Sequence, residues 1–320
     1  MSNAYKSMDD YVAKGNVDIA AITPGGKMQP TQMLTYVKTL TKRSVLLQLC
    51  NVLDPLPTRE WRQPKIGFGD SFIVAPDHSL QETPEAWRAT PQFDEITLNC
   101  MPFKVVAQIP DDTLREVVER NGFIDYLIPL IAEASASDVE KIIIQGDTTI
   151  TPVSLETASL SQMDGLIKKA TSHVYNAAGQ FPSPTILDEI ELEQPEQYRA
   201  LPGTAVLMSS DALIQYRRIK AARPTPGGDA QLTKALVDDH HGVKIYGIPL
   251  FPTTTVGSQK HTVALRCVPE HIFVGFQDNM KIELQRNADA GSTKVVVRSQ
   301  FDSNFKHLEG VVKAIGLRSR

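Results

Sequence analysis

The segment from residue 96 to residue 147 constrains most strongly what this chain can fold into. Apolar side chains alternate with polar ones from Ile96 to Ile109, a period of two that is typical of a strand with one buried face. After a short helix expected between 111 and 122, a second apolar pattern runs at helical spacing from Ile124 to Gln145. That helix would be roughly 33 Å long, about the width of a small domain. The segment therefore predicts a strand followed by a long helix.

Pro129 lies inside the long helix. A proline in a helix interior removes one backbone donor and crowds the preceding turn. We therefore predict one continuous helix that bends between Asp125 and Pro129. The alternative is a helix that begins at Ile128.

Composition limits the class of protein. The 320 residues are 42% hydrophobic and 22% charged, which suffices for a sizeable core in two domains or one large one. The net charge of -4 argues against a nucleic-acid binder with a basic surface throughout. No apolar run approaches about 18 residues, and the first residues lack the apolar core of a signal peptide. We expect no membrane association and a cytoplasm-like setting.

Cysteine and serine residues do not point to catalysis. Cys50, Cys100 and Cys267 are odd in number and unclustered, so we expect buried small side chains and neither a disulfide nor a metal site. Ser209 and Ser210 follow a strand and open a helix, but the glycines of a nucleophile elbow are missing. We interpret them as helix N-caps.

One histidine cluster leaves a metal-dependent enzyme open as an alternative. Asp238-Asp239-His240-His241, with His261 and His271 further on, has the ligand types that zinc or iron accepts. Adjacent histidines in a strand point to opposite faces, and no H-x-x-x-H or H-x-H spacing occurs. We predict no cofactor.

The N-terminal quarter is an arm followed by a long hairpin. Residues 1–41 have no strong periodicity and are mildly basic, and a helix is expected from Gln32 to Leu49. Two strand-like pieces, 60–66 and 71–75, indicate a hairpin whose tip is broken by prolines. An isolated two-stranded hairpin is marginally stable, so something else must support it.

The remainder alternates helices and strands and then becomes β-rich. Acidic residues between Ile186 and Leu201 indicate a solvated helical face, and a strand at 204–208 leads into a helix at 211–220. Further strands are expected in two short pieces within 243–252 and at 261–276, 280–286, 293–301 and 311–317. The fold class is α+β, with the helix at 124–145 laid across a sheet.

Several segments together carry a resemblance to a known family: the loop and strand at 59–109, QIPDDTLREV before the long helix, IIIQGD and MDGL after it, TAVLMSSDALIQYRRIK, GVKIYGIPLFPT and VVVRSQFDSNFKHLEGVVKAIG. In this order they resemble the tailed-phage major capsid protein of the HK97-like fold. The resemblance covers nearly all of the chain and rests on the order and spacing of several motifs.

The resemblance implies four parts. They are an N-terminal arm at 1–53, an extended hairpin called the E-loop at 54–95, a peripheral domain at 96–160 and 277–307 with a spine helix at 124–145, and an axial domain at 161–276 and 308–320.

The implied function is structural. Copies of the chain would form hexamers and pentamers of an icosahedral shell that encloses double-stranded DNA without sequence-specific binding and has a portal at one vertex. The implied partners are a separate scaffolding protein and a decoration or cement protein. Assembly would occur in the host cytoplasm and the product would be the virion capsid. No enzymatic activity is expected.

Two features depart from the family pattern. Cross-linking members place a reactive lysine in the E-loop, whereas the only lysine here, Lys65, lies near the base, so we expect non-covalent contacts. The chain begins almost directly with the arm and lacks the long helical scaffold segment of some members, so either that segment has been removed or a separate scaffolding protein directs assembly, and the initial Met1 favours the second. An encapsulin-like nanocompartment shell, which shares the fold and encloses a cargo protein, is the nearer alternative.

Two hypotheses assign residues to assembly. The acidic E-loop tip would dock on a basic surface of a neighbouring copy, either the arm or a patch on the axial domain. The tip residues are Asp77, Glu82, Glu85, Trp87 and Arg88, and the patch residues are Arg217, Arg218, Lys220 and Arg223. Pro129 would mark where the spine helix bends during shell maturation.

Overall fold

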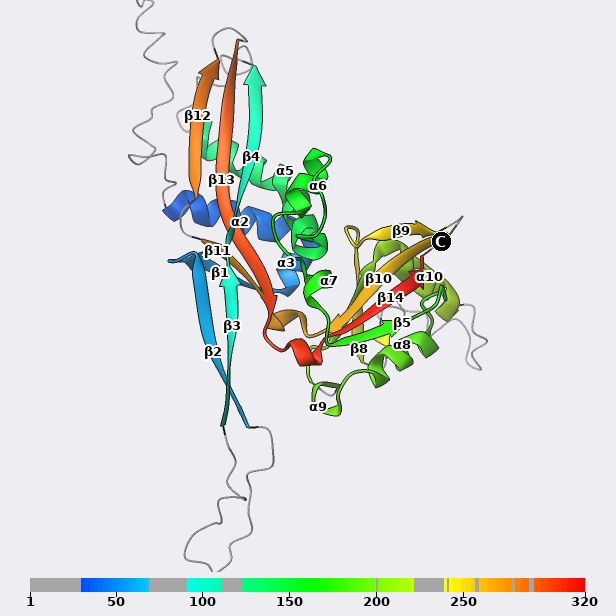
Figure 1. Cartoon of the computed structure of the whole chain (residues 1–320). Coiled ribbons are helices and arrows are strands. Elements are labelled where there is room, and N and C mark those ends of the chain that lie inside the picture. The colour runs from blue at the N-terminus through cyan, green and yellow to red at the C-terminus, as the bar shows by residue number, and fades with distance from the viewer. Residues whose placement is uncertain are drawn as a thin grey trace, which may run out of the picture.

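The computed structural model describes residues 30–68, 91–110, 123–199, 201–221, 239–240, 242–256, 259–277, 280–287 and 291–319. Within these ranges the chain forms two larger sheets, each with its own helices, and a two-stranded hairpin that projects away from them (Figure 1). The α+β class expected from the sequence is confirmed.

A five-stranded sheet is built around the long strand β13 (Ser292–Phe305). Its order is β1 (Asn51–Leu56), β11 (Ile272–Gln277), β13 and β12 (Lys281–Asn287), with β4 (Met101–Pro110) also paired to β13. β1 runs parallel to β11, and the other pairings are antiparallel. β13 is long enough to pair with β4 and β12 along its first part and with β11 along its last part.

Three helices pack into one core with this sheet: α2 (Pro30–Arg43), α3 (Val45–Leu49) and α5 (Phe123–Gln145). The Tyr36 hydroxyl of α2 and the Ser135 hydroxyl of α5 share a buried hydrogen bond of 3.2 Å. The buried Glu140 carboxylate accepts the Leu46 N–H at 2.8 Å, which satisfies a donor in the first turn of α3. Residues expected in an extended arm therefore contribute to the core.

Helix α5 is continuous from Phe123 to Gln145 with Pro129 inside it, as predicted, and does not begin at Ile128. Its buried side chains, Ile131, Ala132, Ala136, Val139, Ile142 and Ile143, form the expected apolar stripe. The bend near Pro129 stays a prediction. The short helix expected between 111 and 122 lies outside the described residues.

A seven-stranded sheet forms the other half of the molecule. Its order is β5 (His173–Asn176), β14 (Val312–Arg318), β10 (Gln259–Cys267), β6 (Ala205–Ser209), β8 (Val243–Ile248) and β7 (Asp239–His240), with β9 (Thr253–Val256) paired to β10. Helices α8 (Pro184–Leu192) and α10 (Ser210–Ala221) pack in a core with this sheet. The Ser209 hydroxyl accepts the Ala212 N–H at 3.2 Å, so the predicted N-cap is confirmed.

The hairpin consists of β2 (Glu60–Phe68) and β3 (Pro91–Asn99), which pair antiparallel from Glu60–Asn99 to Phe68–Pro91. Its base rests on a small apolar cluster that includes Leu56, Leu98 and Phe273, and the Trp61 ring lies edge-on to the Phe273 ring at 6.0 Å. The five-stranded sheet therefore supplies the support that the sequence analysis required. The strand predicted at 71–75 lies outside the described residues.

Four expected elements are wrong in extent. The 96–109 run divides at Cys100, because its first part pairs with β2 and its second with β13. The 261–276 run divides around the 3₁₀ helix η4 (Pro269–His271) into strands of different sheets. The helix expected at 32–49 is broken at Ser44, whose hydroxyl caps α3, and 243–248 is one strand instead of a broken one.

Sheet pairing also shifts strands relative to the expected domain ranges. β1 lies in ranges expected for the arm and the E-loop, and most of β11 lies in the range expected for the axial domain. Both belong to the five-stranded sheet with β4 and β13. Hydrogen bonding between distant segments, which local periodicity does not report, decides this membership.

Candidate assembly surfaces and the junction between the sheets

The hairpin presents an apolar pair on its outer face. Trp61 and Leu98 pack against the body, and because side chains alternate along a strand, Ile66 and its cross-strand partner Phe93 point the other way. Ile66 is 61% exposed and Phe93 is 75% exposed. On the same face the Arg62–Glu95 ion pair of 3.4 Å is exposed and contributes little to stability. This face has the composition of a surface that another molecule covers.

The hairpin base is tied to the sheet by directed hydrogen bonds. The Asn99 N–H donates to Asp302 Oδ2 at 2.8 Å, and Asn304 Nδ2 donates to the Thr97 carbonyl at 2.9 Å. Lys65 reaches Glu309, with Nζ 3.4 Å from Oε2. A force on the hairpin is therefore transmitted to β13 and to the segment that follows it.

The proposed docking residues are only partly described. Asp77, Glu82, Glu85, Trp87, Arg88 and Arg223 lie outside the described residues. Arg217, Arg218 and Lys220 lie in the last turns of α10, where Arg218 is exposed and the Lys220 ammonium lies 5.6 Å from the centre of the Tyr216 ring. Figure 1 shows α10 on the seven-stranded sheet, well away from the described strands of the hairpin. Within one chain, the described part of the hairpin therefore does not contact α10, and the docking of the tip stays a prediction.

Two glycines account for the IIIQGD and MDGL motifs. The Gly165 N–H donates to the Gly146 carbonyl at 2.8 Å, so the end of α5 and the start of α7 (Leu166–Lys169) lie in backbone contact. A Cβ on Gly165 would lie 2.6 Å from Gly146 N, and one on Gly146 would lie 2.4 Å from Met163 O. Only glycine fits at either position without moving the backbone.

Carboxylates stabilise the same turn. Asp147 accepts the Thr149 N–H at 2.8 Å and pairs with Lys168, while Asp164 accepts the Thr148 N–H at 2.9 Å. Hydrogen bonds from Lys168 and Thr149 lower the pKa of Asp147 to about 2. The Asp147 carboxyl is therefore ionised at neutral pH and can accept these hydrogen bonds.

A buried ionic network, which the sequence analysis missed, joins β10 to the end of α8 and to the segment between β13 and β14. Arg266 of β10 is 1% exposed, its Nε donates to Gln194 Oε1 at 2.8 Å, and its Nη2 lies 3.2 Å from Glu191 Oε1. Gln194 Nε2 in turn donates to the Gly310 carbonyl at 2.7 Å. Burial lowers the pKa of Arg266 and the Glu191 carboxylate opposes this shift. The one sequence signal that could have indicated this network is a single arginine inside an apolar strand.

Two histidines of the metal hypothesis have separate hydrogen-bond partners. His240 Nε2 lies 2.7 Å from Asp188 Oδ1, and His261 Nδ1 lies 3.3 Å from the Gly316 carbonyl. Asp238 and His241 lie outside the described residues. Within the described ranges, no group of three or more His, Cys, Asp or Glu side chains could hold a metal ion.

The three cysteines are free thiols, and Cys100 and Cys267 are buried as expected. Burial raises the pKa of Cys267 to about 12 and is the main cause that raises the pKa of Cys100 to about 11. Both thiols are therefore protonated at neutral pH and poor nucleophiles.

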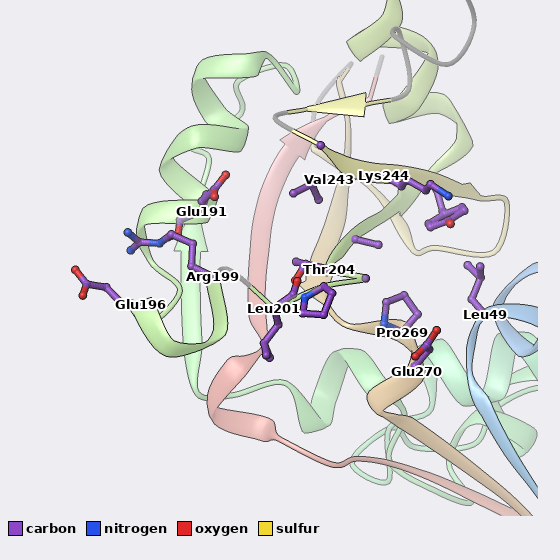
Figure 2. A pocket seen from close by; sticks show the side chains of 15 residues that line it. Leu49, Glu191, Glu196, Arg199, Leu201, Thr204, Val243, Lys244, Pro269 and Glu270 are labelled. Atoms are coloured by element: carbon purple, nitrogen blue, oxygen red, sulfur yellow. The ribbon is translucent and has the colours of Figure 1, made fainter. Parts of the chain in front are cut away.

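A groove of about 790 Å³ runs between α9 (Glu196–Arg199), β8 and η4. Figure 2 shows Glu196 and Arg199 on one side of it and Lys244 and Leu49 on the other. The described residues that line it include no serine, cysteine or histidine. Among all the residues that the structure describes, no helix is long and apolar enough to cross a bilayer.

A curated relative and several solved structures match most of this chain. No family model matches the sequence. A "Putative prophage capsid protein YqbE" from Bacillus subtilis (strain 168) is 25% identical over 314 residues, which cover 97% of this chain and 98% of that protein.

Solved structures show the fold. A chain of the satellite phage P4 procapsid with size determination (Sid) protein has a TM-score of 0.64 at 12% identity, over 97% of this chain and 98% of that one. The capsid of an empty GTA particle gives 0.59 at 13% identity, over 86% of this chain and 90% of that one. The SrpI encapsulin of Synechococcus elongatus PCC 7942 gives 0.54 at 11% identity, over 98% of this chain and 97% of that one. The chain thus has the HK97-like capsid fold.

Proposed function

We propose that this chain is the major capsid protein of a tailed phage or prophage, a structural subunit that assembles into the hexamers and pentamers of an icosahedral shell around double-stranded DNA. The observation that carries the proposal is the correspondence of 97% of this chain to 98% of a phage procapsid chain. The prophage capsid relative also covers 97% of the chain and supports the proposal by sequence. The role is structural, without enzymatic activity, and its place is the virion.

The exposed apolar face of the hairpin is a physical argument for assembly. Its outer face exposes Ile66 and Phe93, and among the described residues its apolar contacts with the body lie at the base, around Trp61 and Leu98. Covering apolar side chains is favourable by about 25 cal/mol for each Å² removed from water, and obligate assemblies bury about 2,000 Å² or more. A second copy of this chain is the partner that a shell provides.

The proposal includes a division into domains and a set of partners. The five-stranded sheet, with β1 and β11 added to the ranges 96–160 and 277–307, would be the peripheral domain, and the seven-stranded sheet would be the axial domain. A separate scaffolding protein would direct assembly in the host cytoplasm, a portal would occupy one vertex, and a decoration or cement protein would stabilise the shell in place of covalent cross-links.

An encapsulin-like compartment is a second candidate, because the SrpI chain matches 98% of this chain with a TM-score of 0.54. Electron microscopy of the chain expressed alone and with its neighbouring genes tests both candidates. Regular shells, rings or tubes would support a coat protein. Nuclease-protected DNA inside the shells would support the phage capsid, and a protein cargo would support the encapsulin-like compartment. A stable monomer under both conditions would refute both.

We propose that the acidic E-loop tip, with Asp77, Glu82 and Glu85, docks on α10 of a neighbouring copy. Deleting residues 77–87 should then reduce the yield of shells, and Arg218→Glu should do the same because Arg218 is exposed on α10. Lys104→Glu, an exposed charge reversal on β4, outside both the arm and α10, is the matched control. Normal shells from both the deletion and Arg218→Glu would refute the docking.

Pro129 is proposed as the point where α5 bends when the shell matures, because a helix that lacks one backbone bond deforms at lower cost. Structures of immature and mature shells would test this. An identical α5 in both would contradict it.

A further inference from the structure

The chain passes three times between the two sheets, and two of these crossings lie side by side. One leads from β10 through η4 to β11, and the other leads from β13 through η5 (Leu308–Gly310) to β14. The Lys306 N–H donates to the His271 carbonyl at 2.7 Å, which ties one crossing to the other. The His271 and His307 rings meet at the same place, with centroids 5.1 Å apart and an angle of 61° between their planes.

The two rings border a very small cavity. Its volume is about 10 Å³, close to the lower limit for one water, and Tyr198, Cys267 and Phe305 also line it. Nδ1 of His307 is buried and has no hydrogen-bond partner among the described residues. A proton added to His307 would therefore place a charge where the protein offers little to solvate it.

The charged groups around the pair favour neutral rings. Lys306 faces both histidines, and Lys65 from β2 also faces His307. Glu270 faces His271 and Glu309 faces His307, but Glu309 already accepts hydrogen bonds from Lys65 at 3.4 Å and Tyr198 at 3.2 Å. Two ammonium groups thus stand beside the pair, and one of its two carboxylates is paired elsewhere.

Burial, the largest cause, lowers the pKa of His271 and of His307. Lys306 adds to the shift for His271, and Lys65, His271 and Lys306 add to it for His307, while the nearby glutamates oppose it. Both rings are therefore neutral at pH 7. An open junction, in which the rings regain the ordinary pKa of about 6.5, would bind protons more readily than the closed one.

We propose that His271 and His307 form a proton-operated latch at the junction of the two sheets. Neutral rings pack against each other and hold the crossings together, which restrains movement of one sheet relative to the other. Protonation of both rings places like charges 5.1 Å apart beside Lys65 and Lys306, and the junction loosens. The free energy that favours the closed junction over the open one decreases as pH falls below the open-state pKa of about 6.5. The decrease is complete once pH is below the lowered pKa values of the closed junction.

Hydrogen exchange read by mass spectrometry on the full chain tests the latch. We compare about pH 7.5 with about pH 5.5, corrected for intrinsic exchange rates, in peptides that cover 268–277 and 303–311. Exchange there should rise by up to about tenfold for each histidine, because pH 5.5 lies about one unit below the ordinary histidine pKa of about 6.5, while β6 changes little. The double variant His271→Gln/His307→Gln should lose this dependence, and His173→Gln on β5 should keep it.

Two results would overturn the latch. One is the absence of a junction-specific acceleration in the wild-type chain, and the other is an acceleration that persists in the double variant. If the double variant does not fold, nuclear magnetic resonance titration of the wild-type histidine Cε1 protons decides. The latch requires that both pKa values lie below about 6.5 and that hydrogen exchange at the junction rises over the same pH range in which the histidines titrate. Values at or above about 6.5 refute it. None of these readouts depends on shell formation.

Discussion

Replacing Gly146 by alanine is expected to force apart the end of α5 and the turn before α7. The new Cβ would lie 2.4 Å from Met163 O, 2.7 Å from Ile142 O and 3.1 Å from Gly165 N. All three are backbone atoms, so no rotation of a side chain can relieve the contact. The chain must shift α5, the turn or both.

The expected cost has two parts. The Gly165 to Gly146 hydrogen bond of 2.8 Å would be stretched or lost, which removes about 1 kcal/mol. Forcing extra volume into a packed site costs about 1 to 3 kcal/mol more. We therefore expect Gly146→Ala to lower the free energy of unfolding by about 2 to 4 kcal/mol, a large share of the roughly 5 to 15 kcal/mol of an ordinary domain.

Urea unfolding followed by circular dichroism measures this loss as a lower midpoint at constant slope. Gly242→Ala is the control, because Gly242 has a φ of +83° but nothing within 4 Å of an added Cβ, so it reports conformational strain alone, about 1 to 2 kcal/mol. Gly165→Ala should match Gly146→Ala, and the double variant should lose less than the sum because both disturb one contact. A loss for Gly146→Ala no larger than that for Gly242→Ala would refute the steric argument.

Three other predictions follow from the site. Glu191→Gln leaves the buried Arg266 without its carboxylate and should cost about 2 kcal/mol of unfolding free energy, and an unchanged urea midpoint would contradict this. Asp147, held by Lys168 and Thr149 at a pKa of about 2, binds fewer protons when folded than the ordinary carboxyl of pKa about 3.9, so its contribution is present above about pH 4 and is lost as pH falls towards 2. Asp147→Asn should therefore flatten the acid loss of stability in that window, and a curve parallel to wild type would count against the argument. The double variant Ile66→Ser/Phe93→Ser should change the unfolding free energy by less than about 0.5 kcal/mol but reduce shell yield by about tenfold, and normal shells would exclude that face from assembly.

Patterns with a local cause were predictable from the sequence. The long helix was visible because apolar residues recur at helical spacing up to Gly146, and the structure places α5 at Phe123–Gln145. The N-cap at Ser209 was visible because a serine between an apolar strand and a helix has a single local function. The hairpin was visible as a segment without a core of its own, although the return strand at 91–99 was assigned elsewhere.

The candidate site was much less predictable. Arg218 is exposed on α10 as the docking hypothesis requires, but the acidic tip lies outside the described residues and its docking stays a prediction. The Arg266 network, the Gly146 to Gly165 contact and the His271 to His307 contact each join residues far apart in the sequence. A single residue in a pattern indicates burial but does not identify the partner.

The sequence by itself determined the local conformations of this protein: which segments are helical, which are extended, where caps and turns fall, and which face of each element is apolar. These depend on residue spacing and on the short-range chemistry of glycine, proline and serine. Only the tertiary structure decided that β10 and β11 enter different sheets and that Cys100 separates two strands with different partners. The reason is physical, because the period-two pattern is the same whichever strand completes the hydrogen bonds, and the partner is chosen by packing over the whole chain.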